Sequence, residues 1–452
     1  MRVMQGARTR LLEITAAALL LALCCAMLPR IALAQAGESG AHPAPDALHF
    51  YLITVDVGDS VWDNFGHSAL RVVDEVNGTD TVYNWGVFEV RGGPAAFAYD
   101  FFMDELQYRL ATQSLGREID NYRAQQRSVW QDELMLSAAQ KQRLLVRLRW
   151  NRAAENIYYD YHYFFDNCTT RIRDYLDEVL DGRLAYSLEG LATRTFRDEV
   201  RAHMSSIQVV RFALDVLMNG DIDRPMTRWE SLFLPLQLRD ALAGMESDVT
   251  VGGQRLPLLA ERETLLAFDS PRSQQDFYAT SSVVLWLMSL FFLALLRRER
   301  RLFSATHARL GFRAPELTLR LFGLLSIVLL GASGIFGTLM LGSWFASGHT
   351  DLYHNVNLLL FWPTDAIGVV AASKWLAVAK PWSLTHNSKP IMVYYLSLKL
   401  FAACVYCVIM WSGFAAQDGF DIALFLVPCL VLLTVVGWIV GFDSARRFDA
   451  IG

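Results

Sequence analysis

The chain has 452 residues, of which 53% are hydrophobic and 19% are charged, and its formal net charge at pH 7 is −5. This length allows more than one domain, and the apolar content is too high for an ordinary soluble protein of this size. The acidic balance gives no sign of nucleic-acid binding. Apolar runs dominate the last third of the chain, so we expect a soluble domain followed by a membrane domain.

Residues 1–34 have the pattern of a secretory signal peptide. A basic start precedes the apolar residues 11–28. Cleavage is expected after Ala34, the last residue of an Ala-Leu-Ala sequence. An uncleaved anchor is the alternative interpretation. Residues 35–45 are rich in proline, glycine and alanine, and we interpret them as a linker.

The soluble domain is expected to cover residues 46–277. Strands are predicted for residues 48–56, 67–73 and 81–85, and Asn77-Gly78 is a strong tight-turn signal between the last two. His67 then lies at one mouth of a small β unit, with Asn84 on the adjacent strand. The pattern does not fix the strand register, so it leaves open whether these two side chains share a face.

Mixed elements follow these strands. The pattern predicts a helix over 95–106, a strand over 107–115, a strand over 128–136, a helix over 137–156 and a helix beginning near residue 168. From 184 to 277 the periodicity weakens, and we expect only mixed helix and loop.

Cys168 is the one cysteine of the soluble part; the others are Cys24, Cys25, Cys404, Cys407 and Cys429. Apolar residues recur at helical spacing after it, Asp166 or Asn167 stands at the expected N-cap, and Gly182 closes the helix. Cys168 therefore lies in or beside a first helical turn. Free amides and the helix dipole there favour a thiolate, which is the nucleophilic form of the thiol. A buried, inert thiol is the alternative.

A nucleophilic thiol needs a base, and the base needs an orienting group. We select His67 as the base and Asn84 as the orienting residue, with Asp56 as the second choice. His162 is expected to pack or to bind substrate, whereas His49 and His203 are weaker candidates for the base. A hydrogen-bonded strand-end histidine is the alternative interpretation of His67.

Three further residues near Cys168 are candidates for substrate binding. Tyr163 belongs to a tyrosine cluster that either packs in the core or lines an apolar groove. Asn167 is most simply explained as the N-cap of the helix that begins near Cys168. Arg171 either pairs with a phosphate or is a solvated charge on the surface of that helix. No cysteine or histidine spacing typical of zinc and no glycine-rich phosphate loop occurs, so we expect neither a metal nor a cofactor.

Five apolar runs from residue 278 to the end are long enough to cross a bilayer, at roughly 20 residues each. They cover approximately 279–296, 318–341, 355–376, 391–413 and 420–441. The basic residues between and after them, including Arg297, Lys374, Arg446 and Arg447, fall on one side, which the positive-inside rule assigns to the cytoplasm. The soluble domain is then expected outside the inner membrane.

The loop before the third run contains His349, His354, Asn355 and Asn357. Polar side chains at a membrane face are costly unless they form hydrogen bonds or contact something functional. The loop faces the side of the soluble domain, so His349, Asn355 and Asn357 are candidates for the substrate site. Interfacial residues satisfied by water and headgroups are the alternative.

Three motifs carry a resemblance to a known family. Phe65-Gly66-His67-Ser68-Ala69-Leu70-Arg71-Val72, Tyr83-Asn84-Trp85-Gly86 and Phe164-Phe165-Asp166-Asn167-Cys168-Thr169-Thr170-Arg171 resemble the Lnb N-terminal periplasmic domain family. The loop leading into Asn357-Leu358-Leu359 resembles the membrane half of the same proteins.

The resemblance implies a bacterial lipoprotein N-acyltransferase. The fold it implies is an α+β papain-like domain, permuted and similar to NlpC/P60, followed by an all-α membrane domain of five transmembrane helices. The expected reaction moves an acyl chain from a phospholipid, through a Cys168 thioester, to the N-terminal amine of a diacylated lipoprotein. The alternatives are a periplasmic cysteine peptidase or amidase acting on peptides or peptidoglycan, and a non-enzymatic envelope scaffold.

Overall fold

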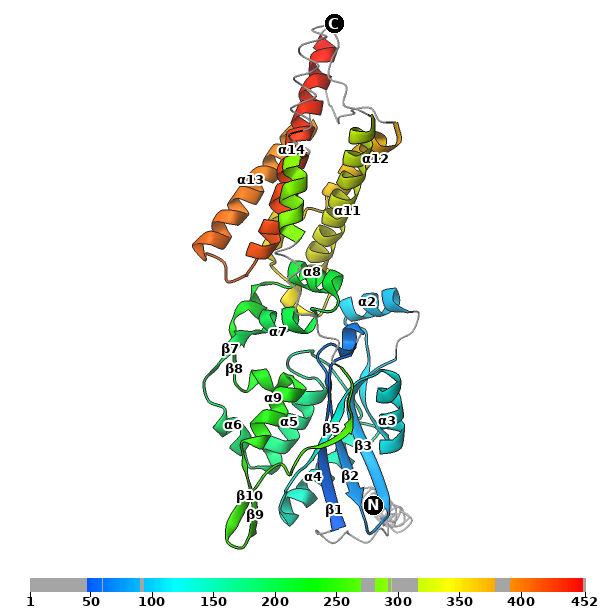
Figure 1. Ribbon diagram of the computed structural model, residues 1–452, viewed down its shortest axis with the longest axis vertical. Coiled ribbons are helices and arrows are strands. Elements are labelled where there is room, and N and C mark those ends of the chain that lie inside the picture. The colour runs from blue at the N-terminus through cyan, green and yellow to red at the C-terminus, as the bar shows by residue number, and fades with distance from the viewer. Residues whose placement is uncertain are drawn as a thin grey trace, which may run out of the picture.

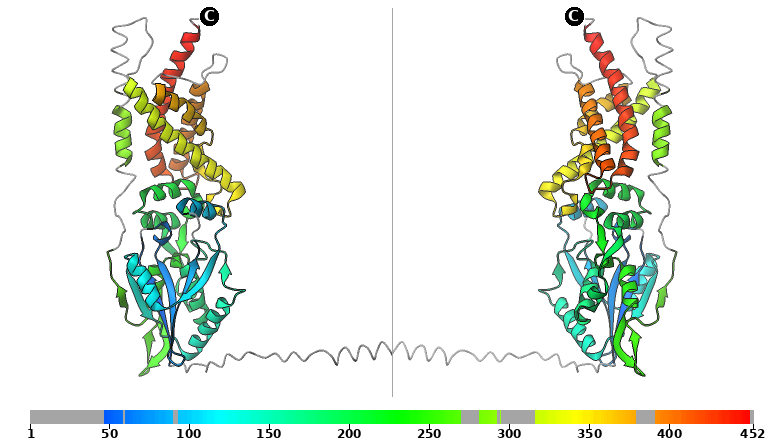
Figure 2. Two further views of the ribbon diagram at one scale, coloured as in Figure 1. Left: turned by 90° about the vertical axis from the view of Figure 1, so that its right-hand side faces the viewer. Right: turned by 90° about the vertical axis from the view of Figure 1, so that its left-hand side faces the viewer.

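The structure is a computed structural model, and it describes residues 47–269 apart from 59 and 90–92, residues 281–291 and 294, and residues 316–378 and 391–449. The predicted signal peptide, the linker and most of the basic loops lie outside these residues. The described chain forms an α/β domain followed by a helical region, and the two are stacked end to end (Figures 1 and 2).

A seven-stranded antiparallel sheet forms the centre of the α/β domain, in the order β11-β5-β1-β2-β3-β4-β6. Its strands are β1 (Leu48–Val55), β2 (His67–Asp74), β3 (Thr79–Val87), β4 (Tyr108–Gln113), β5 (Val129–Glu133), β6 (Tyr158–Tyr159) and β11 (Glu263–Leu266). The three strands predicted first in the chain are confirmed, and Gly78 has the positive φ of 61° that the tight turn requires.

Helices cover both faces of the sheet (Figure 1). On one face α4 (Ala138–Arg152), α5 (Cys168–Val179) and α9 (Pro235–Ala243) enclose the main core. The buried side chains of Phe50, Trp85, Leu144 and Leu176 meet there. On the other face α3 (Leu115–Ala124) packs Tyr122 against the smaller apolar cluster of Ile53, Val55 and Val82. Burial of these side chains, at about 25 cal/mol per Å² of apolar surface, stabilises the sheet.

Two predictions for the soluble domain need correction. The strand predicted over 107–115 ends at Gln113, and α3 begins at Leu115 after Ser114, although no helix was predicted there. The stretch from 184 onward contains short strands as well as helices, because β7 (Leu191–Thr195) pairs with β8 (Pro225–Thr227), and β9 (Glu246–Val251) pairs with β10 (Gln254–Pro257). Strands of three to six residues carry too little alternation to be distinguished from loop.

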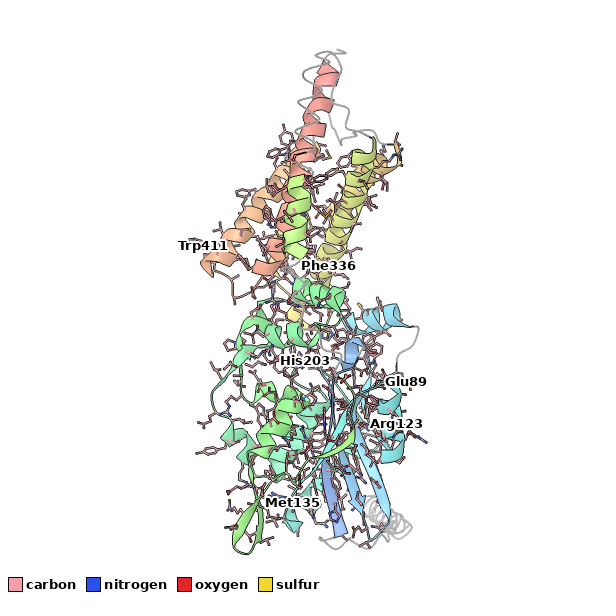
Figure 3. The ribbon with its side chains drawn as sticks, viewed as in Figure 1. Glu89, Arg123, Met135, His203, Phe336 and Trp411 are labelled. Carbon is pink, nitrogen blue, oxygen red and sulfur yellow. The ribbon has the colours of Figure 1, made fainter. Side chains whose placement is uncertain are left out.

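A layer of short helices lies between the sheet and the membrane helices. It contains α2 (Pro94–Phe102), α7 (Phe196–His203) and α8 (Gln208–Leu217), with His203 inside it (Figures 1 and 3). Arg197 of α7 is 1% exposed and donates to Asp223 and to the carbonyls of Met218 and Asn219. This buried guanidinium holds the layer together. Other short elements are η2 (Val61–Asp63), α6 (Arg183–Ser187), η3 (Gly220–Asp223), η4 (Glu230–Phe233) and η5 (Thr350–Leu352).

The helical region consists of α11 (Glu316–Ala346), α12 (Asp365–Val378), α13 (Ile391–Ser412) and α14 (Phe420–Asp449). Among the described residues, three helices are long and apolar enough to cross a membrane: Arg320–Ala346, Ile391–Ser412 and Phe420–Trp438. Ser281–Phe291 is a shorter apolar helix within the first predicted span. Trp411, 89% exposed, lies at the end of α13 nearest the soluble domain (Figure 3).

The third predicted span, residues 355–376, does not form one helix. It begins with the short helix η6 (Val356–Leu359), and α12 starts only at Asp365 and has 14 residues. The side chain of Asp365 accepts a hydrogen bond from the amide of Trp362, and Pro363 has no amide hydrogen to continue a helix. The apolar composition of this segment therefore reflects burial against other helices as well as contact with lipid.

Candidate active site

Cys168 is the first residue of α5, which fits the predicted position. Oδ1 of Asn167 accepts hydrogen bonds from the amides of Thr169 and Thr170, at 2.9 Å each, and the Asn167 amide donates to Oγ1 of Thr170 at 2.7 Å. The predicted N-cap is thus confirmed as Asn167. The Asn167 side chain therefore satisfies two of the free backbone amides in the first turn of α5. Cys168 lies at the positive end of the helix dipole.

His67 and Asn84 share one face of the sheet. Residue 69 pairs with residue 84 across β2 and β3, and His67 lies two residues before Ala69, so both side chains project to the same side. Nε2 of His67 lies 3.0 Å from Oδ1 of Asn84. The register that the sequence left open therefore brings these two residues together.

The ring of His67 and the backbone amide of Ser68 lie close enough to the Cys168 thiol to act on its pKa, and Sγ lies 3.7 Å from Oγ1 of Thr169. Because Asn84 contacts Nε2 of His67, Nδ1 is the ring nitrogen left for the sulfur. Burial would raise the pKa of the Cys168 thiol, but the charge of His67 and the polar groups of His67, Ser68 and Thr169 lower it to about 7. Cys168 as a residue is partly exposed, and a low-pKa thiol that a reagent can reach is the kind that reacts.

The pKa of His67 is raised, opposite to that of Cys168. Burial alone would lower it, but the charge and hydrogen bond of Cys168, together with Asn84, raise it above its ordinary value. Opposite shifts in two hydrogen-bonded groups favour the thiolate–imidazolium pair. The arrangement can activate a sulfur nucleophile and return a proton to a leaving group.

Glu118 extends this chain of contacts, and no pattern in the sequence pointed to it. It is 4% exposed on α3, and its carboxylate accepts a hydrogen bond from Nδ2 of Asn84. The amide group of Asn84 thus directs its nitrogen to Glu118 and its oxygen to His67, and an amide oxygen can only accept a hydrogen bond. Nε2 of His67 is then the protonated nitrogen, and Nδ1 is left as the base.

The three residues expected to bind substrate have specific partners. The Tyr163 hydroxyl donates to Oδ2 of Asp351 at 2.7 Å. Arg171 forms a two-pronged ion pair with Asp166, at 2.5 and 2.6 Å, and its guanidinium lies 4.1 Å from the ring centre of Tyr159. Asn167 is the helix cap, and its Nδ2 donates to the carbonyls of Tyr163 and Phe233. These contacts position the loop before Cys168.

The loop of residues 349–357 contacts the soluble domain through several of its polar residues. His349 lies 2.8 Å, through Nε2, from the carbonyl of Phe101 and stacks on its ring. Asn355 and Asn357 donate to the carbonyls of Val216 and Leu217 at the end of α8, at 2.8–2.9 Å. The two asparagines thus join α8 to the membrane helices, and the structure brings neither to the sulfur by any contact it shows.

The other histidines have separate roles. His49 lies 2.6 Å from Glu133, while Nδ1 of His162 accepts from the amide of Phe164 at 3.2 Å, and burial lowers the pKa of His162. His354 packs against Trp344. Oδ1 of Asp56, the second choice for the orienting group, accepts from the amide of Val57.

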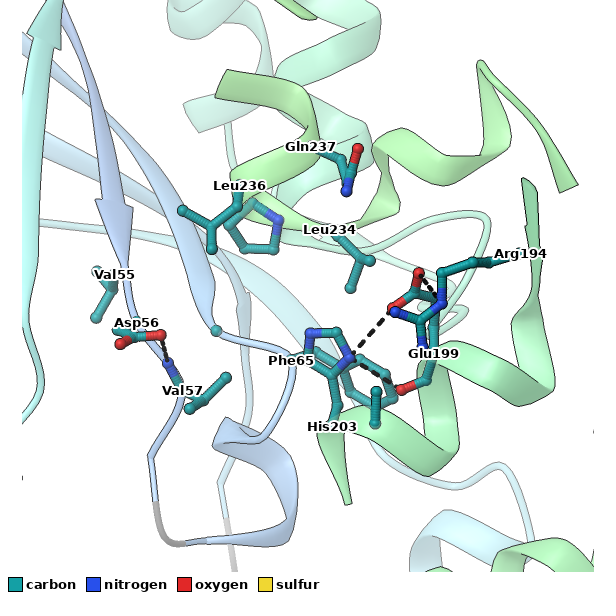
Figure 4. A pocket seen from close by; sticks show the side chains of 13 residues that line it. Val55, Asp56, Val57, Phe65, Arg194, Glu199, His203, Leu234, Leu236 and Gln237 are labelled. Atoms are coloured by element: carbon teal, nitrogen blue, oxygen red, sulfur yellow. Dashed lines mark hydrogen bonds and ion pairs between the residues drawn. The ribbon is translucent and has the colours of Figure 1, made fainter. Parts of the chain in front are cut away.

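A pocket lies beside the ends of β1 and β2, lined in part by Asp56, Gly66, Glu199 and His203 (Figure 4). The His203 ring faces Glu199 within it. Gly66 borders the pocket and precedes His67 in the chain, but Cys168 is not part of its lining. Within the described residues, no group of three or more His, Cys, Asp or Glu side chains is placed to hold a metal ion.

Comparison with known proteins gives one match. Residues 41–205 match the Lnb N-terminal periplasmic domain, and this segment includes His67, Asn84, Glu118 and Cys168. Comparison with curated proteins and with solved structures gave no match. Among the described residues, three helices that follow the matched segment are able to cross a membrane, so the chain is a membrane protein whose residues 41–205 are similar to the Lnb N-terminal periplasmic domain.

Proposed function

We propose that this protein is a membrane-bound lipoprotein N-acyltransferase. It would move an acyl chain from a phospholipid, through a thioester on Cys168, to the N-terminal amine of a diacylglyceryl-cysteine lipoprotein. The observation that carries the proposal is the partly exposed residue Cys168 at the start of α5, whose thiol pKa is lowered by the neighbouring His67 ring that Asn84 contacts.

The first step forms the thioester. His67 takes the proton from Sγ of Cys168, and the thiolate attacks the carbonyl carbon of a phospholipid ester. The C–O bond to glycerol breaks, the lysophospholipid oxygen takes the proton back from His67, and the acyl group remains on sulfur. The Cys168 amide, at the positive end of α5, is placed to stabilise the oxyanion.

The second step forms the amide. The α-amine of the lipoprotein attacks the thioester carbon, His67 accepts the amine proton, and the C–S bond breaks to regenerate the thiolate. A thioester suits this reaction because it is far more reactive toward amines than an ordinary ester is, and a site that excludes water limits hydrolysis.

Aromatic side chains support a lipid as the acyl donor. Tyr161, near Cys168, stacks on Tyr108 at 4.1 Å, Tyr108 contacts Phe88 at 5.1 Å, and Phe88 contacts Phe97 of α2 at 5.5 Å. Phe101, also on α2, stacks on His349 of the membrane loop at 4.8 Å. This series of rings links the surroundings of the thiol to the membrane region and offers apolar surface to an acyl chain.

The fold and orientation fit the same proposal. A cysteine at the start of a helix that packs on an antiparallel sheet, with histidine and asparagine on neighbouring strands, supports a papain-like domain. The end of α14 that contains Arg446 and Arg447 lies away from the soluble domain (Figure 1). This supports a cytoplasmic position for that end, a periplasmic position for the soluble domain and a location in the bacterial inner membrane.

The test is the N-terminal state of lipoproteins in cells that depend on this protein. Cys168→Ala is expected to leave lipoproteins diacylated with a free amine, whereas Cys404→Ala, at an exposed position of α13, is expected to leave them N-acylated. Mass spectrometry of lipoprotein N-termini distinguishes the two states. N-acylated product from cells with Cys168→Ala would refute the proposal, and accumulation of uncleaved peptides instead would favour a peptidase or amidase.

A further inference from the structure

The hydroxyl of Tyr159 is buried next to the thiol and has no use in the steps above. Tyr159 is the second residue of β6, which pairs with β4. Its Oη is inaccessible to solvent. The backbone amide of Gly86 interacts with the oxygen, but no acceptor for the hydroxyl hydrogen is present among the described residues. A buried hydroxyl without an acceptor costs about 1–3 kcal/mol, so its presence calls for a reason.

Gly86 shows how close this hydroxyl is to the candidate nucleophile. A Cβ added to Gly86 would lie 3.8 Å from Oη of Tyr159, 3.9 Å from Cβ of Cys168 and 3.5 Å from the ring of Tyr161. The three side chains therefore surround one small space, which the glycine leaves open. Gly86 has a φ of +77°, a conformation that other residues adopt only with strain.

Arg171 fixes the ring that carries the hydroxyl. Its guanidinium lies 4.1 Å from the Tyr159 ring centre and is held by two hydrogen bonds to Asp166. Burial is the main cause that raises the pKa of Tyr159 well above its ordinary value, and the charge of Cys168 is the second. The hydroxyl therefore keeps its proton at neutral pH and can only gain by donating it to an acceptor that arrives with the substrate.

We propose that Tyr159 is a further catalytic residue, whose hydroxyl donates a hydrogen bond to the carbonyl oxygen of the acyl group during attack by Cys168. This role rests on the proposed function, since it assigns a second donor to the same oxyanion. The charge develops on the carbonyl oxygen as the C–S bond forms, and it disappears when the carbonyl reforms and the leaving group departs. Tyr159 transfers no proton, and the Cys168 amide supplies the other hydrogen bond.

The test compares two reactions of the same sulfur in the full-length protein. Acylation passes through an oxyanion, whereas alkylation by iodoacetamide does not. Tyr159→Phe removes only the hydroxyl, and loss of one oxyanion donor costs roughly a hundredfold or more in rate. We expect Tyr159→Phe to slow acylation of Cys168 by phosphatidylglycerol vesicles by about that factor, and to leave the rate and pH midpoint of alkylation within about twofold of the unsubstituted protein.

Tyr158→Phe is the matched control, since Tyr158 is the neighbouring tyrosine of β6 and is 59% exposed; both rates are expected to be unchanged. A second acyl donor, p-nitrophenyl acetate, separates this inference from the proposed function. If vesicles fail to acylate the unsubstituted protein but the small ester succeeds, the proposal of a phospholipid acyl donor is wrong. The effect of Tyr159→Phe on acylation can still be measured with the small ester.

Two results would overturn the role of Tyr159. One is an acylation rate by the small ester that Tyr159→Phe leaves unchanged. The other is an equal fall of acylation and alkylation, with a shifted pH midpoint, because Tyr159 would then act on the thiolate or on the fold.

Discussion

The carboxylate of Glu118 accepts a hydrogen bond from Nδ2 of Asn84, and this contact turns Oδ1 of Asn84 toward His67. Neither residue touches the sulfur in a contact that the structure shows, yet together they decide which nitrogen of the His67 ring carries the proton. Since the tautomer determines whether Nδ1 can accept a proton from Cys168, a buried residue on α3 controls the candidate base.

Glu118→Ala is expected to slow acylation of Cys168 by tenfold or more, on the order of the loss of a positioning hydrogen bond at a catalytic group. It also leaves Nδ2 of Asn84 buried without a partner, at a cost of about 1–3 kcal/mol of stability. Rates of thioester formation and thermal unfolding measure the two effects. Asp120→Asn, on the exposed side of the same helix, is the control, and an equal effect of both changes would argue against a positioning role for Glu118.

The reactivity of Cys168 should follow pH with a midpoint near 7, because His67 lowers the pKa of the thiol to about 7. Below the midpoint the thiol form dominates, so the alkylation rate by iodoacetamide falls as the pH falls; above it, the rate levels off. His67→Ala removes the lowering contribution and leaves burial, which raises the pKa of the thiol, so the midpoint should move upward. An alkylation midpoint that stays in place after this change would show that His67 does not act on the sulfur.

The sequence predicted the strands and helix that carry His67, Asn84 and Cys168, because each has strong local signals: a tight turn at Gly78 and an asparagine cap at Asn167. It could not supply Glu118, because burial of a glutamate on the otherwise polar α3 depends on the sheet packed against it. Tyr159 was part of a tyrosine cluster in the sequence, and only the fold separates it from exposed Tyr158.

In the membrane region, too, tertiary contacts decided a structure that the sequence pattern could not predict. The apolar run 355–376 was predicted as a span, but tertiary contacts of Asn355 and Asn357 break its start into η6. Hydropathy measures composition, and it does not show whether a segment faces lipid or protein.

Asn357 joins the two regions through complementary hydrogen bonds. Its Nδ2 donates to the Val216 carbonyl at 2.8 Å, and its Oδ1 accepts from the Tyr406 hydroxyl at 2.7 Å. Asn357→Ala removes both of these hydrogen bonds, while the Val216 carbonyl keeps Asn355 and the Tyr406 hydroxyl keeps the Gly419 carbonyl. At about 0.5–1.5 kcal/mol for each lost bond, we expect a loss of about 1–3 kcal/mol in the docking of α8.

Faster amide hydrogen exchange in α8, with unchanged exchange in the strands of the sheet, would measure this loss. Asn121→Ala, at an exposed position of α3, provides the comparison. Equal protection of α8 in the two variants would contradict the docking role of Asn357.

Lys399 and Asp365 form a buried ion pair within the helical region, and Lys399 also donates to the Leu360 carbonyl at 2.7 Å. Removal of one partner leaves the other charge buried, so Lys399→Met should destabilise the protein by about 3–5 kcal/mol. The double change Lys399→Met with Asp365→Leu should recover part of this loss, because no charge then remains unpaired. Thermal unfolding in detergent tests it, and a double variant no more stable than Lys399→Met would contradict the pairing.

The mass of the full-length protein after incubation with phospholipid vesicles that contain one acyl chain length shows directly whether Cys168 carries a thioester. We predict the addition of a single acyl group, located on the peptide that contains Cys168 and removed by neutral hydroxylamine, as a thioester is. No added mass, or an acyl group on another residue that resists hydroxylamine, would contradict a thioester at Cys168.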